Sequence, residues 1–156
     1  MTATGLVCAS LLVCTTAGAN NSTLGPFDAP ARTASRQLFF YENAHLHIAS
    51  ENGNSIAERG YAHGTFNAPV VCTFHISPGH AIKALYTIYP SGGTVSGEAT
   101  ARYVIKNEMG YYGGYMTIKK GTGRFNGASG RNIGFSGTIN RSNFDVVTKV
   151  HGWIAQ

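Results

Sequence analysis

The sequence Gly121-Thr-Gly-Arg-Phe-Asn-Gly-Ala-Ser-Gly130 carries the strongest structural information in this chain. It holds four glycines and lies between two segments with a strand pattern, Tyr115–Lys119 and Ile133–Ile139. Glycine supplies the positive φ and the close backbone approach that tight turns and bulges need. No Gly-Lys-Ser/Thr closes the run and no amphipathic helix follows it, which excludes a phosphate-binding loop. We interpret it as a turn between two strands of an all-β protein.

The chain on both sides of this turn alternates between strand and turn signals. The clearest period of two runs over residues 94–106, where one side carries Val95, Gly97, Ala99, Ala101, Tyr103 and Ile105 and the other side is mostly polar. The other predicted strands are Gln37–Ile48, Gly60–Asn67, Val70–Ile76, Ala81–Tyr89, Gly110–Lys119, Asn132–Ile139 and Asn143–Ile154. Short links between them favour antiparallel neighbours. The sequence therefore predicts an eight-stranded antiparallel up-and-down β-barrel, with a two-sheet sandwich as the alternative.

The N-terminal part of the chain has a different composition from this predicted barrel. An apolar run, Gly5–Cys14, precedes Ala17-Gly18-Ala19, which fits a signal-peptide cleavage site. The run is too short to span a bilayer. We predict a signal peptide over residues 1–19, an extended lead-in over 20–35, one barrel domain over 36–156, and secretion, the alternative being a disordered or buried N-terminal tail. Glycosylation sequons at Asn20, Asn21 and Asn140 agree with a secreted glycoprotein.

Charge and cysteine content exclude several classes of protein. The net charge of +5 reflects scarce acids, and the basic residues are dispersed rather than clustered into a stripe, so nucleic acid is not the predicted partner. Cleavage after Ala19 leaves Cys72 as the single cysteine, which cannot form an internal disulfide. We interpret Cys72 as a small core residue rather than a nucleophile.

The side chains on the predicted inward face are too small to fill a barrel by themselves. Gly97, Ala99 and Ala101 are small, and an eight-stranded barrel either fills with side chains or holds one small ligand. We favour a ligand cavity with an aromatic wall over a core in which large side chains from opposite strands interdigitate. The predicted catalytic residues are Tyr103, Tyr86 and Tyr112, and the predicted substrate-binding residues are Phe74, Met116, Phe135, Ala99, Ala101 and Trp153.

The glycine-rich turn resembles the G-T-G-[KR]-F-x-x-A-x-G signature of the allene oxide cyclase and dirigent barrel superfamily. The likeness in strand order extends from Phe39 to the C-terminus. It implies a lipocalin-like barrel without metal or organic cofactor, often a homo-oligomer such as a dimer or trimer, that binds a reactive apolar molecule in its lumen. Acidic side chains are absent from the predicted apolar faces, which argues against an acid mechanism of the dirigent type.

Other chemistries find weaker support in the sequence. His45 and His47 share a strand face near His63 and His75, a set that could hold zinc, yet no carboxylate or cysteine pattern supports it. We predict surface histidines and no metal. No Gly-x-Ser-x-Gly elbow precedes a helix, so a serine hydrolase is not predicted.

These observations favour a cofactor-free cyclase or isomerase. It would orient a reactive apolar natural-product intermediate for stereoselective ring closure, including pericyclic or cycloaddition chemistry of the Diels-Alderase type. The alternative is a non-catalytic, secreted, lipocalin-like carrier of a small apolar ligand. A third interpretation is a filled barrel whose outer surface binds a partner. A polar constellation inside the lumen would favour catalysis, and a uniformly apolar lumen would favour carriage.

Overall fold

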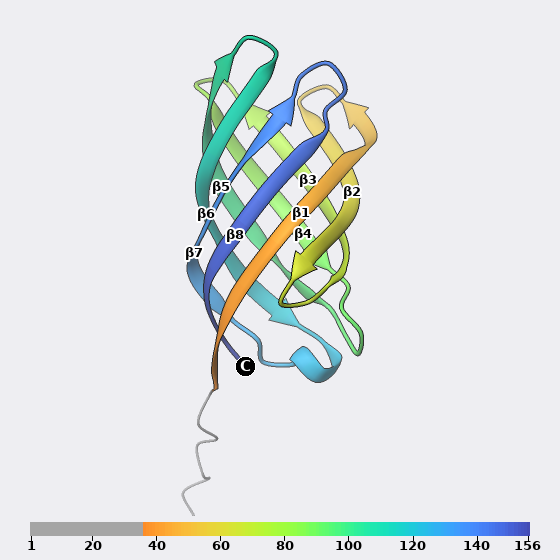
Figure 1. Ribbon diagram of the computed structural model, residues 1–156, viewed down its shortest axis with the longest axis vertical. Coiled ribbons are helices and arrows are strands. Elements are labelled where there is room, and N and C mark those ends of the chain that lie inside the picture. The colour runs from red at the N-terminus through yellow and green to blue at the C-terminus, as the bar shows by residue number, and fades with distance from the viewer. Residues whose placement is uncertain (1–35) are drawn as a thin grey trace, which may run out of the picture. The chain divides into compact units, whose positions relative to one another are not determined.

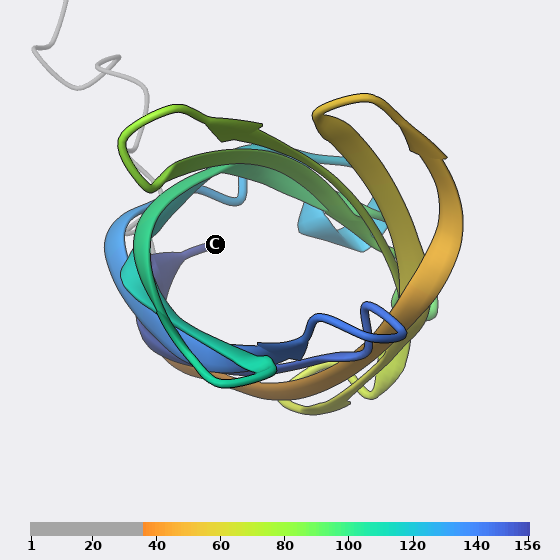
Figure 2. The same cartoon turned by 90° about the horizontal axis from the view of Figure 1, so that it is seen from above.

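The computed structural model describes residues 36–156, which form eight antiparallel strands closed into one barrel (Figures 1 and 2). The strands are β1 (Gln37–Asn52), β2 (Ser55–Gly64), β3 (Ala68–Ser77), β4 (Ala81–Ile88), β5 (Val95–Lys106), β6 (Met109–Gly121), β7 (Gly130–Asn140) and β8 (Val146–Ala155). Each pairs with its sequence neighbours, and β8 pairs with β1, so these strands leave no free edge. The predicted up-and-down barrel is confirmed.

The N-terminal predictions concern another part of the chain. The signal peptide, the lead-in segment and the sequons at Asn20 and Asn21 lie outside the described residues. Within residues 36–156, no helix is long and apolar enough to cross a membrane.

The second strand begins five residues and ends three residues earlier than the sequence pattern indicated. The predicted range Gly60–Asn67 is wrong at both ends, because β2 begins after a two-residue turn at Gly53-Asn54 and ends at Gly64. Gly53 has a positive φ of 58°, which suits the first position of a tight hairpin. Asn67 has a φ of 46°, and its side-chain amide bonds both the N–H and the carbonyl of Gly64. This side-chain-closed turn ends β2 where a continuing strand was predicted.

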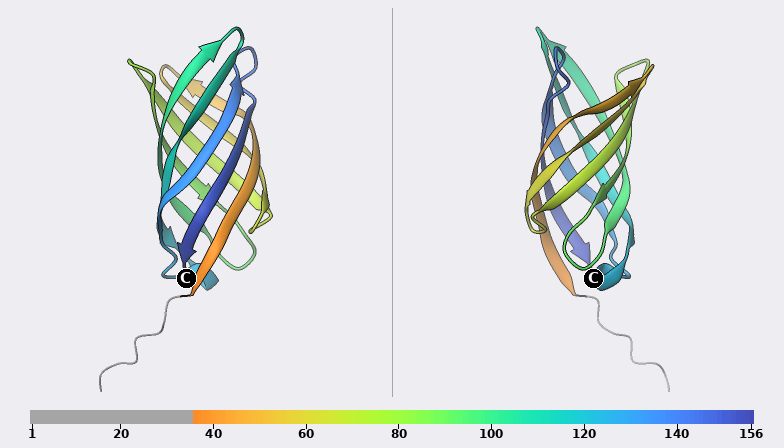
Figure 3. Two further views of the ribbon diagram at one scale, coloured as in Figure 1. Left: turned by 60° about the vertical axis from the view of Figure 1, so that its left-hand side comes forward. Right: turned by 90° about the vertical axis from the view of Figure 1, so that its right-hand side faces the viewer.

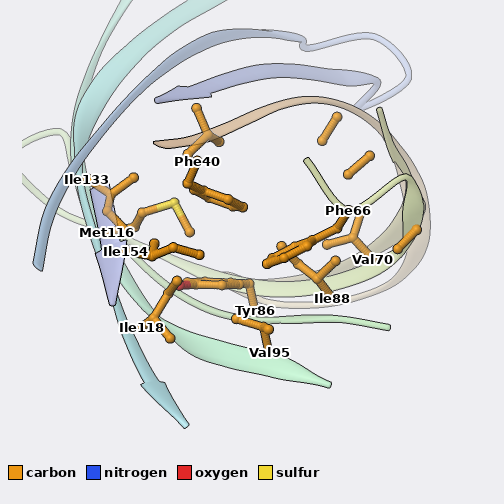
Figure 4. Packing of buried hydrophobic residues seen from close by; sticks show 14 of the residues in the cluster. Phe40, Phe66, Val70, Tyr86, Ile88, Val95, Met116, Ile118, Ile133 and Ile154 are labelled. Carbon is orange, nitrogen blue, oxygen red and sulfur yellow. The ribbon is translucent and has the colours of Figure 1, made fainter. Parts of the chain in front are cut away.

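The glycine-rich turn forms a cap over one end of the barrel, the lower end in Figure 1. It contains a short 3₁₀ helix, η2 (Gly123–Phe125), and sends the buried Phe125 inward. The Phe125 ring meets Phe66 edge-on at 5.1 Å between centroids, and Phe66 in turn lies 5.3 Å from Phe40. We call these three rings the aromatic plug, and Figure 4 shows Phe40 and Phe66 among their apolar neighbours. The stretch is thus a turn between two strands, as predicted, and it also supplies one ring of the plug.

Glycine is required in this cap for two separate reasons. Gly123 has a φ of 58°, and a Cβ there would lie 2.0 Å from the carbonyl oxygen of Gly92 in the β4–β5 link. A Cβ on Gly121 would lie 1.8 Å from the carbonyl oxygen of Phe125. No side chain fits at such distances, so the close approach of the two links depends on glycine.

The strands incline to the barrel axis (Figure 3). Alternate residues along the strands face the lumen, as the burial of β1 and β2 shows. On β5 the inward residues include Val95, Ala99, Ala101 and Tyr103, as the sequence alternation predicted. This face, together with its counterparts on the other strands, defines the interior.

Candidate functional site

The lumen contains a cavity of about 350 Å³, within the range of small-molecule sites. It begins above the aromatic plug and extends to Arg141 and Phe144 in the β7–β8 connection, which we call the mouth. Most of its wall is apolar. The cavity supports the predicted ligand-holding interior over a filled core.

Eight of the nine predicted site residues line this cavity. They are Tyr103, Tyr86, Tyr112, Phe74, Met116, Phe135, Ala99 and Ala101. The structure places them together but does not test their catalytic or binding roles, which stay predictions.

Trp153 is the exception, and its predicted place beside a bound substrate is wrong. Its side chain is 60% exposed on the outer face of β8, where it meets Phe39 of β1 edge-on at 5.3 Å. Both faces of β8 carry apolar residues, so periodicity left the inward face of this strand open. Val146, Val150 and Ile154 are the buried ones.

Two carboxyl groups inside the barrel overturn the prediction that acidic side chains are absent from the inward faces. Glu42 on β1 and Glu58 on β2 are each only 1% exposed, and both line the cavity. Glu42 lies at every-second-residue spacing on the same inward face as Phe40, Ala44 and Leu46. This period-two spacing was visible in the sequence. Glu58 lies on the same buried face as Ile56 and Ala62, but the predicted strand began only at Gly60 and left Glu58 between two predicted strands.

Glu58 has no hydrogen-bond partner for either carboxyl oxygen among the described residues. Burial, and secondarily the negative charge of Asp145 in the β7–β8 connection, raise the pKa of Glu58 to about 8. Its cross-strand neighbour is Cys72, which in turn pairs with Tyr86. At neutral pH Glu58 is therefore mainly a neutral acid that can donate a proton into the cavity.

Glu42 occupies a different level of the same lumen. Its Oε1 accepts a 2.7 Å hydrogen bond from the Phe66 N–H, while Oε2 has no partner among the described residues. Burial raises the pKa of Glu42 to about 7, and the Phe66 hydrogen bond opposes that rise. Glu58 lies opposite Ile48, six positions along β1 from Glu42, and six extended residues span about 20 Å. The two carboxyls therefore lie at separate levels of the lumen.

Tyr86 and Tyr112 each lie across a cross-strand glycine. Tyr86 pairs with Gly97 and Tyr112 with Gly137, and each hydroxyl lies 2.6–2.7 Å from where a glycine Cβ would be. The Tyr86 hydroxyl donates to the Thr117 carbonyl at 3.1 Å. Tyrosines placed over glycines in this way support strongly curved strands.

The Tyr112 hydroxyl also forms hydrogen bonds, with the Thr148 hydroxyl and the Val147 carbonyl. Burial raises the pKa of both Tyr86 and Tyr112. Their hydroxyl protons are therefore held by the barrel wall, which favours a structural role for these two tyrosines.

Tyr103 differs from the other two tyrosines. It is half-buried near the mouth, with its ring edge-on to His80 at 5.0 Å. Within residues 36–156 its hydroxyl makes no hydrogen bond, so among the three it is the one free to meet a ligand.

Cys72 and the histidines complete the inventory of reactive groups. Burial, then the charge of Glu58, raise the pKa of Cys72 to about 12, so it is a packed thiol. The predicted surface histidines His45, His47, His63 and His75 are exposed. In the described part of the chain, no three metal-binding side chains gather into a site.

Comparisons with protein-family models, curated proteins and solved structures found no match to this chain. The closed eight-stranded barrel is compatible with the superfamily that the glycine-rich turn resembles. What the site does therefore has to be argued from its own residues.

Proposed function

We propose that this protein is a cofactor-free cyclase of the allene oxide cyclase and dirigent-like type, which binds a reactive apolar molecule in its lumen and directs stereoselective ring closure. The observation that carries the proposal is Glu58, a buried carboxyl that faces an apolar cavity and has no hydrogen-bond partner within residues 36–156. A carrier needs only the apolar wall. A buried ionisable group costs stability, and such groups concentrate where chemistry is done.

Glu58 supplies the acid step in this proposal. With a pKa of about 8 it holds its proton at neutral pH and donates it to a carbonyl or epoxide oxygen as the ring closes. The proton returns to Glu58 when the cyclised product loses one from carbon, so an isomerisation consumes no net proton. General acid catalysis of this kind contributes on the order of 10²–10⁴ in rate.

The wall supplies orientation. Ala99 and Ala101 leave room beside Met116 and Phe135, so a flexible apolar chain can fold against this side of the lumen. The aromatic plug closes the far end and keeps water out. Holding the reacting atoms in a near-attack arrangement lowers the barrier by up to about 7–11 kcal/mol in favourable cases.

The test is a turnover assay with a panel of unsaturated epoxides and polyenes, analysed by chiral chromatography. We expect the full chain to form a cyclised product with enantiomeric excess, and Glu58→Gln to reduce its rate at least 100-fold while an apolar fluorescent probe still binds. The matched control is Glu98→Gln, because Glu98 is exposed and pairs with Lys119 on the outer face. Binding of panel members with no acceleration over buffer would refute the cyclase and support the carrier.

A further inference from the structure

The lumen offers a ligand more hydrogen-bond acceptors than donors. Glu58 has two carboxyl oxygens without a partner in the described chain, and Glu42 has one. The hydroxyls of Tyr86 and Tyr112 are engaged with the barrel wall. A ligand that satisfies this interior has to bring its own N–H or O–H groups.

The charged groups around Glu58 also favour a ligand that brings its own hydrogen-bond donors. Facing it are Cys72 from β3 and Tyr112 from β6, both neutral at physiological pH, and Asp145 from the β7–β8 connection. Asp145 is itself paired with His47 at 2.5 Å on the exposed side of β1. Among residues 36–156, the one basic side chain that lines the cavity is Arg141 at the mouth. The carboxyl groups of Glu42 and Glu58 therefore lie inside the lumen, while the positive group lies at its entrance.

We propose that the lumen selects an apolar molecule with a basic nitrogen, whose ammonium group pairs with the Glu58 carboxylate. This inference rests on the proposed binding of a small apolar molecule in the lumen and not on the acid step, because an amine that takes the Glu58 proton is a ligand of the lumen and not a substrate for that step. A neutral amine takes the proton of the Glu58 carboxyl, which gives an ammonium and a carboxylate without any further reactant. The nitrogen then donates to the two oxygens that lack partners.

Two aromatic rings in the cavity wall can also interact favourably with an ammonium group. Tyr112 and Phe135 lie 6.1 Å apart between centroids on one side of the lumen, and both line the cavity. Aromatic faces attract an ammonium group most strongly where water is excluded. A neutral alcohol of the same length gains the apolar contacts but neither the ion pair nor the contact of a cation with the rings.

The test is displacement of a neutral apolar probe, N-phenyl-1-naphthylamine, by decylamine, 1-decanol and decanoate below their aggregation limits. At pH 8 we expect decylamine to bind at least tenfold more tightly than decanol, and decanoate more weakly than decanol. Below pH 8 the decylamine affinity should fall by about tenfold per pH unit, because Glu58 has to lose a proton to form the ion pair. Glu58→Gln should remove the amine preference and leave decanol affinity within about twofold, whereas Glu98→Gln should leave both unchanged.

The outcomes separate this inference from the proposed function. If the probe and all three decyl compounds fail to bind, small-molecule binding in the lumen fails, and both claims fall. If the probe binds but decanol matches decylamine, or the preference survives Glu58→Gln, the amine inference alone is overturned. Tight binding of decanoate would also overturn it and would assign the polar end of the ligand to Arg141.

Discussion

Replacing Glu58 by glutamine should change how the stability of the barrel depends on pH. The pKa of Glu58 is 4.5 in an unfolded chain and about 8 in the folded barrel. Between these values the folded protein keeps a proton that the unfolded chain has lost, so stability falls as pH rises. At 1.36 kcal/mol per pH unit, the loss attributable to this residue approaches about 5 kcal/mol by pH 8. Glutamine has no such proton to lose.

Urea unfolding of the full chain at several pH values between 4.5 and 8, followed by circular dichroism, measures this difference. Glu58→Gln should match the wild type within about 1 kcal/mol at pH 4.5 and exceed it by up to about 5 kcal/mol at pH 8. Glu42 is still present in Glu58→Gln, so the stability of the variant keeps a smaller pH dependence of the same sign, because the pKa of Glu42 is about 7. The exposed Glu98→Gln control should lower stability by at most about 1 kcal/mol at every pH. Parallel curves for wild type and Glu58→Gln would refute the assignment of Glu58 as a buried neutral acid.

Three further predictions concern the barrel wall and its end. Phe125→Ala should lower the free energy of unfolding by about 3–5 kcal/mol, because it removes a ring of the aromatic plug, whereas Phe39→Ala, at an exposed position, should cost much less. Equal losses of the two variants in urea unfolding would show that the cap is not packed as described. Gly97→Ala should be destabilising at or above the upper end of the usual range of about 1–3 kcal/mol for overpacking, since its Cβ would lie 1.9 Å from the Thr117 carbonyl oxygen. Gly113→Ala, where the atom nearest to the added Cβ lies 3.6 Å away, is the control for thermal melting, and equal Tm values would contradict the close approach. Cys72 should react with iodoacetamide at pH 8 at least about 100-fold more slowly in the native chain than in urea, because its pKa rises from 9.0 to about 12. Peptide mass spectrometry follows the reaction, and comparable rates in the two states would show an accessible thiolate.

The barrel could be predicted from sequence because its information is local. The β5 alternation places Ala99, Ala101 and Tyr103 on one face, and the glycine-rich turn marks the connection to β7. Short links then leave an antiparallel order as the simplest one. The same local reasoning located most of the cavity wall.

The acid site could not be predicted so directly. Glu58 was hidden by a wrong start for β2, which begins directly after the two-residue turn at Gly53-Asn54. The end of β2 depends on the Asn67 side chain closing a turn onto Gly64. The engagement of the Tyr86 hydroxyl depends on Thr117, which is 31 residues away in sequence. The orientation of Trp153 is set by pairing with β1, since both faces of β8 are apolar. These features arise from contacts between distant segments, which period-two patterns do not record.

The most direct measurement of the central claim is a carboxyl ¹³C NMR titration of the full chain with labelled glutamate and aspartate. Of the seven acidic side chains, two should titrate near pH 7 and pH 8, and Glu58→Gln should remove the higher of these. Adding N-phenyl-1-naphthylamine should move these two resonances and leave that of Glu98 in place. Midpoints near pH 4 for all seven groups, or no response of Glu42 and Glu58 to the probe, would contradict a ligand-binding lumen built around buried carboxyl groups.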